Sequence, residues 1–141
     1  NLFYINNDGS VNGSGDGMLA YCFAEKKGFS KFGSYVGNGS SDGSYIHLGF
    51  KPAFLIYKQS SASGESWIMH DNARNLFNVT NKRLLANAGN VEADEPIDFL
   101  SNGFKCRTSG AFQNASGSTY IYMAFAENPL VGTNGVPATA R

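Results

Sequence analysis

Acidic side chains are the first residues to examine for chemistry, because a pair of carboxyl groups can cleave a glycosidic bond. Glycosidases hold such a pair roughly 5–10 Å apart in a cleft. The run from Glu92 to Pro96 is polar and predicts a solvated loop. Glycan cleavage is therefore the less favoured interpretation, and its candidates are Asp71, Glu92, Asp94, Glu95 and Asp98.

The two histidines, His47 and His70, are the next candidates, as zinc ligands or as a catalytic base. Neither lies at a spacing typical of zinc sites, and no His/Cys cluster accompanies them. A Ser-His-Asp triad is not indicated, since the chain lacks a Gly-x-Ser-x-Gly motif. We expect both histidines to be packed or edge residues. The sequence predicts no catalytic residue, no metal ligand and no cofactor.

One oxygen-rich stretch near the start of the chain invites a calcium interpretation. Asp8, Ser10 and Asn12 have the alternate spacing of ligands in a calcium-binding loop. Such a loop needs a glutamate at its twelfth position, and that position holds Leu19. A plain turn is the favoured interpretation.

Aromatic side chains offer a different chemistry, which is stacking on sugar rings. Loops rich in Asn, Ser and Gly, such as Gly37–Ser44 and Gln59–Ser66, can add hydrogen bonds beside them. Most aromatic residues are nevertheless needed to fill a core. The candidate surface-binding residues are Tyr35, Asn38, Tyr45 and Trp67.

A repeat indicates the elements that position these residues. The segment Asn12–Glu25 is echoed without a gap by Asn114–Glu127, 102 residues later. Both copies share an Asn-x-Ser-Gly turn, an apolar stretch and a Phe-Ala-Glu ending. Self-similarity of this kind predicts one structural unit used in tandem. We expect residues 1–25 to end a preceding unit, residues 26–130 to form a complete domain, and residues 131–141 to be an extended tail.

The repeat also assigns roles to two glutamates and two cysteines. Glu25 and Glu127 end equivalent strands, which favours an ion pair or a turn cap over a binding site. Cys22 and Cys106 fall at positions where the other copy has no cysteine, which predicts two free thiols. Cys22 is expected to be a small buried residue.

The composition favours an all-β domain. The 141 residues include 17 glycines and 13% aromatic residues but only 16% charged residues. Lys and Arg together equal Asp and Glu, so no basic surface is predicted for nucleic acid or an anionic membrane. No apolar run approaches the roughly 18 residues that span a bilayer.

Alternating segments separated by turn residues recur about every ten residues and predict strands. The last of them is apolar on both faces, so we expect a central strand covered on both sides. Two packed antiparallel sheets, in a β-sandwich of jelly-roll or lectin-like type, provide such burial. A short helical turn is expected between Asp71 and Thr80. The predicted strands are Met18–Glu25, Phe32–Val36, Tyr45–Leu48, Ala53–Lys58, Trp67–His70, Arg83–Ala86, Ile97–Leu100, Gly103–Thr108 and Thr119–Glu127.

Five longer stretches of the chain form a recognisable series in a fixed order, and they are Ser30–Ser40, Gly49–Lys58, Trp67–Arg74, Ile97–Phe104 and Tyr120–Pro129. Together they resemble a poorly characterised β-rich domain at the C-terminus of tail-fibre and virion proteins of marine tailed bacteriophages. The resemblance runs from about Met18 to Arg141.

The resemblance implies a structural appendage of the virion, assembled in the bacterial cytoplasm with both cysteines reduced. It implies no catalytic residues. We expect a non-enzymatic domain that attaches to a host surface glycan or protein, as a homo-oligomer such as a trimer, beside other virion proteins. Multiple copies would strengthen weak contacts through avidity. A purely structural capsid decoration or fibre module, and a glycan depolymerase, are the alternatives.

Overall fold

The computed structural model describes residues 2–128, and the tail predicted at residues 131–141 lies outside this part. The regular secondary structure of the described chain is almost wholly antiparallel strand, which confirms the all-β prediction. One short helix precedes them. The elements are α1 (Gly9–Asn12), β1 (Ser30–Val36), β2 (Tyr45–His47), β3 (Pro52–Gln59), β4 (Ile68–Asp71), β5 (Thr80–Leu85), β6 (Ala93–Leu100), β7 (Gly103–Cys106) and β8 (Thr119–Ala126).

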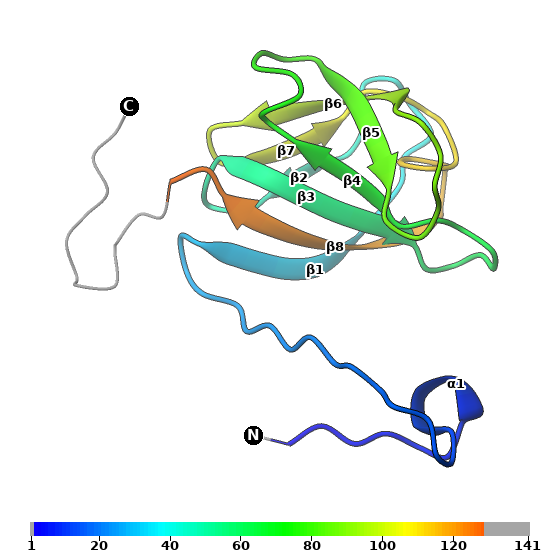
Figure 1. Cartoon of the computed structure of the whole chain (residues 1–141). Coiled ribbons are helices and arrows are strands. Elements are labelled where there is room, and N and C mark those ends of the chain that lie inside the picture. Colours follow the sequence, from blue (N-terminus) through cyan, green and yellow to red (C-terminus); the bar gives the residue numbers. More distant parts are fainter. Residues whose placement is uncertain (1, 129–141) are drawn as a thin grey trace, which may run out of the picture.

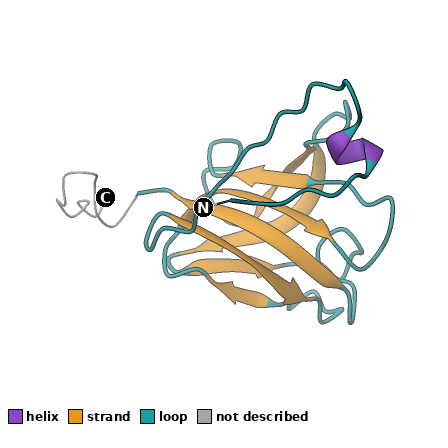
Figure 2. Cartoon of the chain, turned by 90° about the horizontal axis from the view of Figure 1, so that it is seen from below, coloured by secondary structure: helices purple, strands orange, loops and turns teal. Residues whose placement is uncertain are grey.

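The eight strands follow one another in the order β1-β8-β3-β4-β5-β6-β7-β2. The sheet curves strongly, so that it nearly closes around its contents (Figures 1 and 2). β1 and β2 are the two end strands of this order. The finer prediction of two separate layers of jelly-roll type stays a prediction.

The core lies on the concave side of this sheet and is rich in aromatic rings. Tyr35 of β1 stacks on Tyr120 of β8, with 5.0 Å between ring centroids. Phe104 of β7 meets both Tyr35 and Tyr122 edge-on. These contacts join β1 and β8, at one end of the strand order, to β7, the neighbour of the other end strand. Each such pair adds about 1 kcal/mol beyond its buried area.

The strand β8 is central, as predicted, because it pairs with β1 on one side and β3 on the other. Its alternate residues Tyr120, Tyr122 and Ala124 are buried in the core. The opposite face was expected to be covered as well, and this is wrong: Ile121 is 37% exposed and Phe125 is only half-buried. Only one face of the sheet encloses the core.

Two other predictions about elements are corrected. Met18–Glu25 is not a strand, because a strand needs a partner to satisfy its backbone, and within residues 2–128 no strand lies beside it. The segment from Asn72 to Val79 forms turns without a helix. The single helix of the described chain is instead α1, whose first turn is capped by the carboxylate of Asp8 accepting from Ser10 N at 2.8 Å.

The acidic run from Glu92 to Pro96 is also not a loop, since β6 begins at Ala93. Glu95 points into the core and is only 7% exposed. Its carboxylate lies 3.9 Å from Nε of Arg83 on β5, and burial raises its pKa despite this neighbour. Within residues 2–128, no helix is long and apolar enough to cross a membrane.

Candidate functional site

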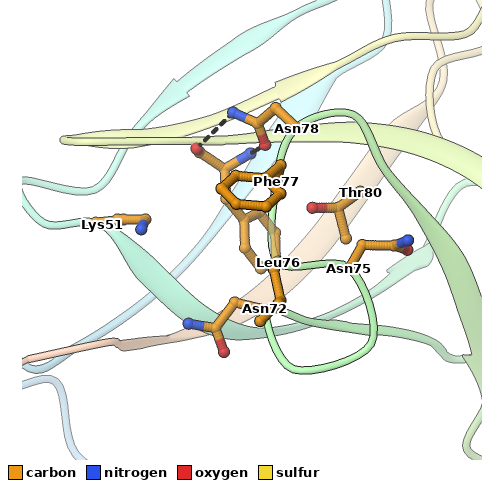
Figure 3. Close-up of a pocket in the computed structure, with 8 residues that line it drawn as sticks. Lys51, Asn72, Asn75, Leu76, Phe77, Asn78 and Thr80 are labelled. Carbon is orange, nitrogen blue, oxygen red and sulfur yellow. Dashed lines mark hydrogen bonds between the residues drawn. The ribbon is translucent and has the colours of Figure 1, made fainter.

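A hollow of about 200 Å³ opens on the surface where the connection from β4 to β5 lies beside the start of β5 and the end of β6. Figure 3 shows the side chains around it. Thr80 and Phe99, both buried, form part of its lining, and Lys51 approaches from the start of β3. The remaining lining residues all belong to the connection, and they are Asn72, Asn75, Leu76, Phe77 and Asn78.

The connection is held in shape by side chains that replace backbone partners. Asp71 Oδ1 accepts hydrogen bonds from the backbone N of Ala73 and Arg74, at 3.0 and 2.9 Å. Asn75 Oδ1 accepts from the backbone N of Asn81 and Lys82. Such local side-chain bonds explain why this polar stretch forms turns instead of a helix.

Asn78 fixes the far end of the connection by acting as a strand partner. Its Nδ2 donates to the carbonyl of Phe99, and its Oδ1 accepts from the backbone N of Phe99, both at 2.9 Å. Figure 3 draws both bonds. The reciprocal pair anchors the loop to β6, and the residues just before Asn78 are thereby held in place.

The consequence is an outward display of two apolar side chains. Leu76 is 77% exposed and Phe77 is 82% exposed. A phenyl ring and an isobutyl group held in water by a braced loop are unusual, because the free energy of the chain favours their burial. An exposed apolar pair with a polar rim is typical of an interaction site.

Glu127 shapes the other rim of the hollow. Its carboxylate pairs with Lys51 Nζ at 2.7 Å and accepts from Asn72 Nδ2 at 3.2 Å. The ion pair predicted for Glu127 is therefore present. Within the described residues Glu25 forms no ion pair, and it instead lines a second hollow with Lys27 and His47.

The predicted binding residues do not gather in this hollow. Tyr35 lies in the core with 9% of its surface exposed, which corrects its assignment to the surface. Tyr45 is exposed on the end strand β2. Trp67 is half-buried just before β4, with Lys58 Nζ 5.8 Å from its ring centroid. Three strands separate β2 from β4 in the sheet order.

Asn38 is exposed but its side chain is engaged within its own loop. Its Nδ2 donates to the carbonyl of Asp42, and its Oδ1 accepts from Ser40 N and from Asn114 Nδ2. The side chain of Asn38 therefore builds the loop, and a role of Asn38, Tyr45 or Trp67 in binding stays a prediction.

The candidate catalytic carboxylates each lie near a cationic side chain. Arg74 joins two of them, with its Nε 2.6 Å from Asp71 Oδ2 and its Nη1 against Glu92. Asp94 pairs with Lys82 at 2.7 Å, and Asp98 lies 3.3 Å from Arg107 Nε. With Glu95 near Arg83, all five have neighbours that suit a structural role.

The histidines and cysteines occupy contrasting environments. His70 is buried and its Nε2 lies 3.3 Å from the hydroxyl of Tyr57, whereas His47 is exposed on β2. Burial and then the charge of Arg83 lower the pKa of His70 to about 4. Both cysteines are free, as predicted.

Burial raises the pKa of Cys106 to about 12. Cys22 is exposed and not buried as expected, because its segment has no sheet beside it. Among residues 2–128, no three His, Cys, Asp or Glu side chains converge to hold a metal ion.

Leu76, Phe77 and Lys51 were not predicted from the sequence. A signal was present, since Leu76 and Phe77 are the adjacent apolar residues of a polar stretch that lacks strand alternation, with asparagines on both sides. An apolar pair without a period has no sheet or helix face to enter. Fold and site together define a curved antiparallel β-domain with a braced, apolar-tipped loop.

The chain belongs to a family described as a domain of unknown function (DUF7483), whose model matches residues 1–129. The matched region includes both the eight strands and the N-terminal segment ahead of them. No curated protein and no solved structure matches the chain.

Proposed function

We propose that this chain is a non-enzymatic, tail-fibre-like appendage domain of a bacteriophage virion, with a sandwich of jelly-roll or lectin-like type, which attaches to a host cell-surface glycan or protein. The observation that supports it best is the display of Phe77 and Leu76 beside amide groups on a braced loop. The proposed place on a virion rests on the resemblance of the sequence to virion proteins. Attachment by a homo-oligomer would multiply weak contacts by avidity.

The hollow suits a small element of a larger ligand. Its volume of about 200 Å³ is below the roughly 300–1,000 Å³ of pockets that enclose drug-sized molecules. A sugar ring could lay its C–H face on Phe77 and direct hydroxyl groups to Asn72 and Lys51. Asn75 and Asn78 use their carbonyl oxygens to hold the loop, so they position the aromatic ring.

The test is attachment of the full chain to host cells and to an array of surface glycans. Phe77→Ser should weaken attachment at least about fivefold, because the loss of one aromatic stacking contact weakens binding by about 1–3 kcal/mol. Val91→Ser is the matched control, since Val91 is equally exposed on the opposite connection, between β5 and β6. Equal attachment by both variants would contradict a role of the hollow.

A purely structural capsid or fibre module is the second candidate, and a different surface favours it. Phe125 on the outer face of β8 contacts a cluster of four other phenylalanines, with ring centroids 5.8–6.2 Å away. This outer face is apolar and only partly covered. A chain that binds neither cells nor glycans, yet occupies a fixed position in intact particles seen by electron microscopy, would support this candidate. If the chain lowered the viscosity of a polysaccharide solution and the Asp71→Ala variant did not, a depolymerase would be supported instead.

A further inference from the structure

The repeat in the sequence is also a repeat in the backbone. Residues 8–17 and residues 110–119 make the same turn, with every partner displaced by 102 residues. Val11 N and Asn12 N donate to the carbonyl of Asp8, and Gln113 N and Asn114 N donate to the carbonyl of Gly110. Asp16 N donates to Gly13 and Ser118 N donates to Ala115. Gly15 and Gly117 follow with φ of 84° and 73°.

The two copies differ in what surrounds them. In the second copy, the side chain of Asn114 is wholly buried, and its Nδ2 donates to Asn38 Oδ1 and to the carbonyls of Ser40 and Thr108. The equivalent Asn12 is exposed. Figures 1 and 2 show the first copy leading away from the sheet between the start of β1 and α1, with Phe23 still in contact with Phe32 and Phe125.

The side chains of the first copy follow the pattern of a buried strand, although this segment is not part of the sheet. Its positions equivalent to the buried face of β8 are Met18, Ala20 and Cys22, all apolar. Its other face carries Leu19, 76% exposed, and Tyr21, 78% exposed. A segment that is apolar on both faces and keeps its backbone unpaired is a ready template for joining a sheet.

The position of β8 in the sheet indicates what kind of partner the first copy would need. β8 fills the position between β1 and β3 and the turn before it sits against the loop at Gly37–Ser40. In a second copy of this chain, its own β8 already fills that position. The fit therefore requires a domain of this fold in which the position between β1 and β3 is open.

We propose that residues 8–25 are the closing turn and strand of another domain of this fold, in a tandem arrangement in which one domain's last strand leads directly into β1 of the next. Cys22 takes the buried position of Ala124, and Asn12 takes that of Asn114. Only the turn Lys26–Phe29 then links two domains, and it is closed by hydrogen bonds from Phe29 N and Ser30 N to the carbonyl of Lys26.

The phenylalanine rings around Phe125 form a contact across the proposed junction between the two domains. Phe23, on the outer face of the proposed strand, already contacts Phe125 and Phe32 of the following domain, with ring centroids 5.8 and 6.3 Å away. This inference does not depend on the proposed attachment function, and it explains why so many apolar residues of the first copy are exposed.

The test builds the missing partner from the chain's own sequence. Because the repeat is 102 residues, residues 26–102 joined ahead of the full 141-residue chain restore one complete unit before the second. Cys22 should then react with a maleimide at least about a hundredfold more slowly than in the 141-residue chain, because its thiol is reached only by opening of the sheet. Cys106, buried within the second domain, reports that this domain is folded in both chains.

A matched control uses the opposite face of the same proposed strand. Leu19→Cys, in a Cys22→Ser background, corresponds to the 37%-exposed position of Ile121 and should be slowed far less by the added residues. Similar rates at positions 19 and 22 in the longer chain, with Cys106 protected, would overturn the proposal. So would protection of Cys22 in the 141-residue chain that grows with protein concentration, since that would show strand exchange between identical copies.

Discussion

Two parts of this molecule, residues 8–25 and residues 110–127, have related sequences and opposite surroundings. Their turns have the same backbone hydrogen bonds and the same left-handed glycine. Their strands do not agree: Thr119–Ala126 is paired on both edges, whereas Met18–Glu25 is unpaired. The comparison teaches that the turn is encoded locally, whereas the strand exists only where a sheet receives it.

The largest expected effect separates the two asparagines. Asn114→Ala should lower the free energy of unfolding by about 4 kcal/mol, because it removes several hydrogen bonds and leaves buried partners unsatisfied. Asn12→Ala should change it by less than about 0.5 kcal/mol, as expected for an exposed side chain. Urea unfolding followed by the fluorescence of Trp67, the sole tryptophan, measures both. Equal losses would show that the first copy is already part of the folded core.

The comparison also marks what a sequence can and cannot reveal. Alternation correctly located the eight strands from Phe32 onward, most clearly β3, β6 and β8, whose residues alternate between buried and more exposed positions. The same alternation wrongly predicted a strand at Met18–Glu25, because a period says nothing about whether a partner is present. The burial of Glu95 was missed for a related reason: it depends on β6 pairing with β5 and β7, which no local pattern records.

The candidate site was less predictable than the fold. Tyr35 looked like a stacking residue, but its ring is needed between Tyr120 and Phe104. Phe77 and Leu76 are exposed because Asn75 and Asn78 bond to backbone groups of β5 and β6. The bonds of Asn78 join residues 21 positions apart, and they form only once β5 and β6 have paired.

Acid should lower the stability of the sheet and have no comparable effect through the first copy. The folded-state pKa of His70, about 4, lies below its usual 6.5. The stability linked to His70 is therefore complete above about pH 6.5 and is lost as the pH falls towards 4, by about 3 kcal/mol. Residues 8–25 contain no histidine, so this loss belongs to the sheet.

His70→Gln should flatten the dependence of the urea midpoint on pH between 6.5 and 4.5, while His47→Gln, on exposed β2, should retain it. Retention of the full acid dependence in His70→Gln would assign it to other groups. The measurement needs only unfolding curves at several pH values.

The smallest expected effect concerns the two glycines. At both Gly15 and Gly117 an added Cβ meets no atom within 4 Å, so alanine is opposed only by the left-handed backbone. Gly117→Ala should cost about 1 kcal/mol of global stability. Gly15→Ala should leave global unfolding unchanged in the 141-residue chain and should cost a similar amount once residues 26–102 are joined ahead of it. If Gly15→Ala still left the stability of the longer chain unchanged, the two turns would not have equivalent surroundings.

The pairing of β1 with β8 determines how the domain responds to mechanical tension. Ser30, where the chain comes into the sheet, lies directly opposite Phe125, next to where it leaves. Figure 1 shows both connections at the same end of these strands. A pull through the two connections therefore loads the bonds between β1 and β8 one after another, as in opening a zipper, and never all together in shear. Under tension such a domain would lengthen at low force, and β1, an end strand with a single neighbour, would detach first.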